Sequence, residues 1–92
     1  MNTPWGKSNY TEKVCPGITF FSTASHGGYH VSKRLNKLIP AKWKLSGRYE
    51  QWYEEDCGWA PLAATFPQHF PKITEADLAR TIPMWEDWVN FR

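Results

Sequence analysis

The chain has few cysteines, little net charge and no long apolar run. Its two cysteines, Cys15 and Cys57, are far apart and form no CxxC pair. Such sparse cysteine usage excludes a disulfide-rich scaffold and is typical of reduced thiols in a cytoplasm. No segment approaches the roughly 20 apolar residues that cross a bilayer. The first residues lack the basic start and apolar run of a signal peptide. We therefore expect a cytoplasmic protein with no membrane partner.

Length and ring content indicate one small domain. A chain of 92 residues has room for one modest core, because chains of this length bury about 60 to 65% of their unfolded surface. We therefore treat residues 1–92 as a single domain. Aromatic residues make up 16% of the chain, so we expect rings to pack against rings in much of the core.

The charges are segregated along the chain. A formal net charge of +2 is too small to indicate a partner. The middle of the chain, however, holds six basic residues and no acid: Lys33, Arg34, Lys37, Lys42, Lys44 and Arg48. Acids follow directly, at Glu50, Glu54, Glu55 and Asp56. Two neighbouring blocks of opposite sign are candidates for a binding surface.

Strand signals cluster in the first third of the chain. Residues 10–14 and 18–24 are predicted as strands, joined by a turn at Pro16-Gly17, because proline presets one turn torsion and glycine accepts the positive one that often follows. The stretch 29–31 is a candidate for a short third strand. These segments predict a small antiparallel sheet.

Helix signals fill the remainder. Ser32 is placed to cap a helix that Pro40 closes, with Leu35, Leu38 and Ile39 on its apolar face. Residues 53–66 are predicted as a second helix, since acids favour a helix N-terminus. Pro61 predicts either a kink there or a helix that begins only near Pro61.

A helix start at Thr74 and Asp77 introduces the last segment, in which Pro83 either begins a new helix or kinks the existing one. The predicted fold class is therefore α+β, with a small antiparallel sheet packed by three or four short helices.

The bend at residues 22–30 is the first candidate site. An imidazole of His26 or His30 would serve as a base for the thiol of Cys57. The acids directly before Cys57 oppose this reading, because they stabilise the protonated thiol. A zinc site would combine His26, His30, Cys57 and Asp56, but zinc ligands usually come in close pairs on both sides of a site. The alternative is that the imidazoles bond to groups at the bend.

The same bend is a candidate anion cradle. Hydroxyls and a glycine pair would present backbone amides to a phosphate, with Lys33 and Arg34 nearby; the members are Ser22, Thr23, Ser25, His26, Gly27 and Gly28. The chain lacks the GK[ST] and GxGxxG patterns of nucleotide sites. Hydroxyls at a strand end more often satisfy the turn backbone.

Two stretches are candidate partner surfaces. Residues 33–48, with the rings of Trp43 and Tyr49 interleaved, carry the charges and rings that hold single-stranded nucleic acid, although a protein partner or a solvated helix face is favoured. The second stretch combines rings and acids that would be adhesive if exposed: Trp52, Tyr53, Glu54, Glu55 and Asp56. Helix capping is the simpler explanation of its acids.

Five segments of the chain have the character of motifs: Thr3-Pro4-Trp5-Gly6, Pro16-Gly17-Ile18, Ser22 to Gly28, Trp52 to Cys57, and Phe66-Pro67. Together they resemble an uncharacterised small domain family found in phage, plasmid and other mobile-element proteins. The resemblance spans most of residues 3–70 and implies no activity, so it supplies no catalytic residue. It implies a context in which small stand-alone proteins block host defence systems by binding them.

The sequence therefore predicts a non-enzymatic protein that inhibits a host defence complex, such as a CRISPR or restriction nuclease complex. Its expected partner is a host protein or ribonucleoprotein, and no cofactor or metal is expected. The alternative is a small enzyme or a nucleotide- or metal-binding protein with its site at the Ser-His-Gly-Gly bend and Cys57. The oligomeric state is left open.

Overall fold

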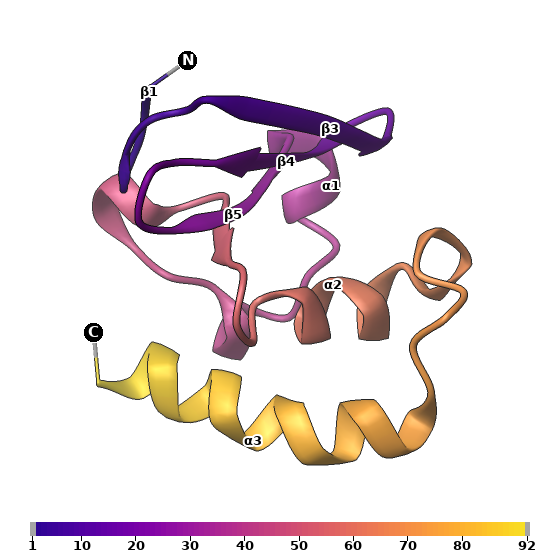
Figure 1. Cartoon of the computed structure of the whole chain (residues 1–92). Coiled ribbons are helices and arrows are strands. Elements are labelled where there is room, and N and C mark those ends of the chain that lie inside the picture. Colours follow the sequence, from indigo (N-terminus) through magenta and orange to yellow (C-terminus); the bar gives the residue numbers. More distant parts are fainter. Residues whose placement is uncertain (1, 92) are drawn as a thin grey trace.

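The computed structural model describes residues 2–91. Its strands are β1 (Asn2–Thr3), β2 (Gly6–Lys7), β3 (Tyr10–Cys15), β4 (Ile18–Ser22), β5 (Gly27–Val31) and β6 (Trp52–Glu54). Its α-helices are α1 (Lys33–Asn36), α2 (Trp59–Thr65) and α3 (Glu75–Asn90), and its short 3-10 helices are η1 (Ala41–Trp43), η2 (Gly47–Tyr49) and η3 (Pro67–His69). The predicted α+β class is confirmed (Figure 1).

Four strands form an antiparallel sheet in the order β3-β4-β5-β6. The predicted hairpin of β3 and β4 is present, and its turn contains Gly17 at a φ of +98°. β5 pairs with β4 along its whole length and begins at Gly27, so the predicted third strand is longer than expected. β1 and β2 form a separate two-stranded ribbon near the N-terminus.

The prediction of a helix over residues 53–66 is wrong at its start. Residues 52–54 instead form the edge strand β6, in which Tyr53 pairs with Tyr29 of β5. The helix begins at Trp59, which places Pro61 in the first turn, where its missing N–H costs no intrahelical bond. The acids expected at the helix N-terminus lie outside the helix: Glu54 ends β6, and Glu55 and Asp56 lie in the turn that joins β6 to α2.

The first predicted helix is shorter than expected. Ser32 caps it by accepting a hydrogen bond from the Leu35 N–H, as predicted, but α1 ends at Asn36 rather than near Pro40. The chain then turns through a bond from the Ile39 N–H to the Asn36 carbonyl, since a residue before proline disfavours helical torsions. Leu38 consequently points outward and is 64% exposed, whereas Ile39 is buried.

The last segment is one continuous helix. Thr74 and Asp77 form the predicted capping box, and α3 continues through Pro83 without a break. No helix within residues 2–91 is long and apolar enough to cross a membrane.

The core lies between the sheet and the two longer helices, and α2 lies between the sheet and α3 (Figure 1). Its buried members are Cys15, Ile18, Val31, Ile39, Tyr53, Cys57, Leu62, Phe66 and Trp85. Trp85 is fully buried, and its Nε1 donates to the carbonyl of Trp43 at 2.9 Å. The hydroxyl of Tyr53 donates to the side chain of buried Asn36. Rings therefore supply much of the packing, as the composition predicts.

Trp85 should be a main support of α3. The substitution Trp85→Phe removes volume and the Nε1 donor from a fully buried position, and we expect it to lower the free energy of unfolding by about 1–3 kcal/mol. The matched substitution Met84→Ala, at a neighbouring position that is 57% exposed, should change it by less than about 0.5 kcal/mol. Urea denaturation measures both, and equal losses would contradict this packing of α3.

Candidate functional site

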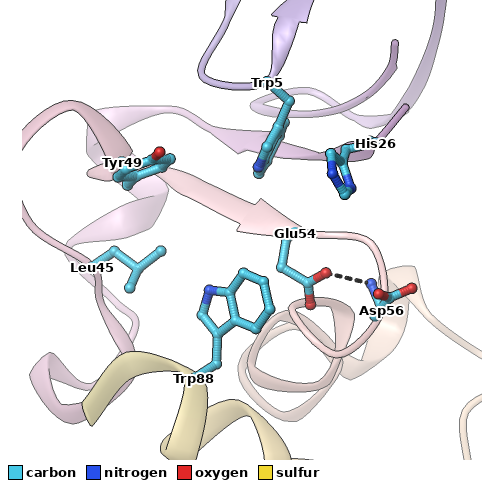
Figure 2. Close-up of a pocket in the computed structure, with 8 residues that line it drawn as sticks. Trp5, His26, Leu45, Tyr49, Glu54, Asp56 and Trp88 are labelled. Carbon is cyan, nitrogen blue, oxygen red and sulfur yellow. Dashed lines mark hydrogen bonds between the residues drawn. The ribbon is translucent and has the colours of Figure 1, made fainter. Parts of the chain in front are cut away.

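Segments far apart in the sequence meet around one pocket of about 330 Å³. Its lining residues are Trp5, His26, Gly27, Leu45, Tyr49, Glu54, Asp56 and Trp88 (Figure 2). Trp5 comes from the turn between β1 and β2, His26 from the bend before β5, and Glu54 from the end of β6. The pocket thus draws on three of the segments that the sequence singled out, at Thr3-Pro4-Trp5-Gly6, at the glycine bend and at the acidic run.

The bare α-carbon of Gly28 determines where Trp5 lies. A Cβ on Gly28 would stand 2.3 Å from Cη2 of Trp5 and 2.7 Å from the Tyr53 carbonyl oxygen, which is closer than real atoms approach. The Trp5 ring also meets Trp52 edge to face, with 5.7 Å between ring centroids. The Thr3 hydroxyl closes the turn that carries Trp5 by donating to the Gly6 carbonyl at 2.8 Å. Trp5 is therefore a firmly held wall of the pocket.

Glu54 holds the turn between β6 and α2. Its Oε1 accepts from the N–H of Cys57 at 2.6 Å and of Gly58 at 3.2 Å. Its Oε2 accepts from the N–H of Asp56 at 2.9 Å. Glu54 is 5% exposed, and all of these donors are neutral. A carboxylate used in this way satisfies backbone donors that a turn and a helix start leave without partners.

The thiol of Cys57 donates to Oε1 of Glu54 at 3.0 Å and is buried. Burial raises the pKa of this thiol to about 12, with the Glu54 carboxylate and then Asp56 acting in the same direction. Since the thiolate is the nucleophile, Cys57 is held in its inert form. The sequence argument that the preceding acids oppose activation is confirmed.

Neither histidine activates Cys57. His30 packs its ring against Trp52, with 4.8 Å between centroids, and burial lowers the pKa of its imidazole. His26 is exposed at the bend, where its backbone exchanges hydrogen bonds with Thr23. No hydrogen bond within residues 2–91 joins either imidazole to Cys57. The proposed base and nucleophile pair of His26 or His30 with Cys57 is therefore not formed.

The metal hypothesis fails in the described part of the chain. Residues 2–91 contain no group of three or more His, Cys, Asp or Glu side chains that could hold a metal ion. His26, His30, Cys57 and Asp56 therefore do not form a zinc site in this fold.

One hydroxyl that the anion hypothesis relied on forms hydrogen bonds with the backbone of the bend. The Thr23 hydroxyl donates to the His26 carbonyl at 2.6 Å and accepts from the His26 N–H at 3.1 Å. Gly27 and Gly28 lie in β5, where they pair with Ser22 and Phe21 of β4, and Ser25 is exposed. An ideal Cβ on Gly27 would be 2.9 Å from Oε2 of Glu55. A carboxylate so near, with Glu54 and Asp56 beyond it, disfavours an anion at this bend.

The basic residues lie on the surface, and three of them converge. The second hollow, of about 310 Å³, is lined by Lys33, Asn36, Lys37, Lys44, Glu50 and Gln51. Lys33 and Lys37 extend from α1 and the following turn, whereas Lys44 follows η1. We call this the basic hollow. Arg34, Lys42 and Arg48 are also exposed.

The expected aromatic and acidic patch is wrong in part. Trp52 is 8% exposed, Tyr53 1% and Glu54 5%, because all three lie in β6 and contribute to the core or its edge. Only Glu55 and Asp56 of that run are exposed. The rings of Trp52 and Tyr53 therefore pack within the fold and are not part of an exposed adhesive surface.

Sequence reasoning did not assign four of the pocket residues to any site. Trp5 was noted only as part of the motif Thr3-Pro4-Trp5-Gly6, and Tyr49 only as a ring within the basic stretch. Leu45 and Trp88 belonged only to predicted structural elements. Nothing in the sequence places Trp88 of α3 opposite Trp5, because that juxtaposition depends on how α3 packs beneath the sheet (Figure 2).

Cys57 should resist alkylation in the folded protein. With its pKa raised from 9.0 to about 12, its thiolate fraction near neutral pH falls by about 1,000-fold. In a Cys15→Ser background, iodoacetamide should label the protein only after urea unfolding, as read by intact mass. Rapid stoichiometric labelling of the native protein would contradict the inert thiol and revive the nucleophile hypothesis.

The same thiol should make stability fall in alkali. The folded state keeps the Cys57 proton until about pH 12, whereas the unfolded chain releases it above its ordinary pKa of 9.0. The unfolded state then binds fewer protons, so stability decreases by at most about 1.4 kcal/mol per pH unit across that window. The contribution of Cys57 is the difference between the pH dependence of the urea midpoint in the wild type and in Cys57→Ala, because all other groups titrate in both proteins. If the two midpoints change with pH in parallel, this contribution is absent and the prediction is wrong.

The comparisons with known proteins give one match. No curated protein and no solved structure matches the chain. One family model matches residues 1–90, and its description assigns no activity. This agrees with the resemblance to an uncharacterised family. Because the match covers nearly the whole sequence, the chain belongs to the family described as "Domain of unknown function (DUF7007)".

Proposed function

We propose that this chain is a non-enzymatic phage or mobile-element protein that binds and inhibits a host defence complex in the host cytoplasm. The defence setting is supported by the resemblance of Thr3-Pro4-Trp5-Gly6, the glycine bend and the acidic run to domains of mobile-element proteins. The binding role is supported by the surface of the fold.

The basic hollow is the observation that carries the binding role. Lys33, Lys37 and Lys44 line one concavity, and none of them forms an ion pair with any other of residues 2–91. Within residues 2–91, the only ion pair joins Arg80 to Asp77. Three lysines against the single carboxylate of Glu50 give the hollow an excess of positive charge. That excess is available to the acidic groups of a partner, and such complementarity steers and orients association.

An acidic protein face is a better partner for this hollow than a nucleic acid. The nearby rings that sequence reasoning offered for base stacking have other contacts. Trp43 is half-buried, its Nε1 donates to Glu86 at 3.0 Å, and Lys42 stands over its ring. The amides of Asn36 and Gln51 in this hollow bond to Tyr53 and to the Val31 carbonyl, so the lysines are the groups that would meet carboxylates at a protein interface.

The chemistry of the site favours binding over catalysis. Cys57 is the one side chain that the enzyme alternative uses as a nucleophile, and it is buried and protonated. Its hydrogen bond goes to the Glu54 carboxylate rather than to the imidazole that the enzyme alternative requires. A surface binder needs only a complementary face.

A plating assay tests the proposal. The chain is expressed in bacteria that carry a defined restriction or CRISPR system, and the efficiency of plating of a targeted phage is measured. The wild type should raise plating in the presence of at least one system and leave it unchanged in its absence. The variant Lys33→Glu, Lys37→Glu, Lys44→Glu should return plating to the level without the chain, because it reverses the charge of the basic hollow.

The matched control places the same three charge reversals elsewhere. Lys7, Lys13 and Lys72 are exposed and lie outside the hollow, so their triple reversal to Glu should keep the wild-type effect. No rise in plating with either type of defence system would overturn the inhibitor proposal. Equal loss in both triple variants would show that net charge, not this hollow, matters.

A further inference from the structure

The pocket beneath Trp5 has the composition of a receptor for a positively charged group. Three of its walls are rings, from Trp5, Tyr49 and Trp88, and they come from three separate parts of the fold. In Figure 2, Trp5 and Trp88 lie on opposite sides of the space, and Tyr49 lies beside Leu45. Ring faces attract cations within about 6 Å of their centres. Rings arranged around one space therefore favour a cation in it.

Two carboxylates line the same pocket. Asp56 is exposed at its edge, and its side chain accepts no hydrogen bond within residues 2–91. Glu54 is buried, and Figure 2 shows its carboxylate beside Trp88 and directed toward Asp56. Among residues 2–91, the residues that line the pocket include two acids and three rings but no lysine or arginine.

The environment of Glu54 strengthens this argument. Within the described part of the chain, its oxygens accept from backbone N–H groups and the Cys57 thiol alone. These donors orient the carboxylate but carry no positive charge. A buried carboxylate gains most from a nearby positive charge, because the local dielectric screens it weakly. The guanidinium of Arg48 does not supply that charge in the pocket, since it donates to the Pro4 carbonyl at 2.9 Å and stands over the Tyr49 ring without lining the pocket.

We propose that this pocket binds an organic ammonium group carried on a short apolar stem, with Trp5, Tyr49 and Trp88 around the cation and Glu54 and Asp56 beside it. A volume of about 330 Å³ is at the small end of the range for ligand pockets. The stem packs on Leu45 and the rings. The ammonium group comes either from a small free molecule or from a lysine side chain of a partner protein. This inference does not depend on the inhibitor proposal.

Paired probes test the charge requirement on the purified full chain. Choline is compared with dimethylbutanol, its uncharged carbon analogue, and Nα-acetyl-lysine methylamide with Nα-acetyl-norleucine methylamide. Titrations are followed by the indole N–H signals in NMR spectra, assigned by single Trp→Phe substitutions. At least one charged probe should bind about tenfold more tightly than its neutral twin, with the largest shifts at Trp5 and Trp88.

The two charged probes distinguish the sources of the group. Tighter binding of choline assigns the pocket to a free quaternary ammonium ligand, and tighter binding of the lysine amide assigns it to a side chain of a partner. Equal affinities within both pairs, shifts centred on other tryptophans, or no saturable binding of any probe would each overturn the proposal. None of these outcomes depends on phage plating, so the two proposals fail separately.

Substitutions locate the negative charge. Asp56→Asn should weaken binding of the charged probe by about threefold to tenfold, and Glu54→Gln by more. Glu54→Gln also replaces an oxygen that accepts hydrogen bonds in the turn, which can prevent folding. If the Glu54→Gln protein does not fold, the Asp56→Asn protein alone tests the role of negative charge. The control Asp87→Asn changes an exposed acid of α3 outside the pocket and should leave affinity unchanged. Equal affinity of Asp56→Asn and the wild type would contradict a role for this carboxylate.

Discussion

The buried carboxylate of Glu54 is the constraint on which the middle of the structure depends. Three successive backbone N–H groups, of Asp56, Cys57 and Gly58, converge on it. Gly58 allows this convergence, because a Cβ there would lie 2.4 Å from the Glu54 carbonyl oxygen. The chain can therefore leave β6, turn at once and enter α2, which then packs between the sheet and α3 (Figure 1). Without such an acceptor, buried turn donors would each lose a partner.

The same carboxylate determines the chemistry of its surroundings. It accepts a hydrogen bond from the Cys57 thiol. This bond favours the protonated thiol, which is not nucleophilic. It also lines the pocket with Asp56, so the glycine bend, which resembles an anion cradle in sequence, faces negative charge in the fold. Glu54 thus determines the turn geometry, adds to the effect of burial on the pKa of Cys57, and with Asp56 makes the pocket negative.

Local signals predicted the local structure and no more. The hairpin was predictable because Pro16-Gly17 carries its own turn preference, and the Thr74 capping box because its spacing is fixed. β6 was missed because its pairing partner β5 lies across a long connection, and the acids beside it also suit a helix N-terminus. Single segments of the pocket were recognised in the sequence, but the pocket itself was not, because Trp5, Tyr49 and Trp88 are brought together by tertiary packing.

β6 separates two concavities of opposite charge. Gln51, directly before this strand, lines the basic hollow, and Glu54, its last residue, lines the acidic pocket. The backbone of Gln51 is fixed against β5, because its carbonyl accepts from the Val31 N–H and its Nε2 donates to the Val31 carbonyl. Three residues of extended chain span about 10 Å. A partner that presents an acidic group and an ammonium group at about this spacing would bind in one orientation only, because reversing it would place like charges together at both sites.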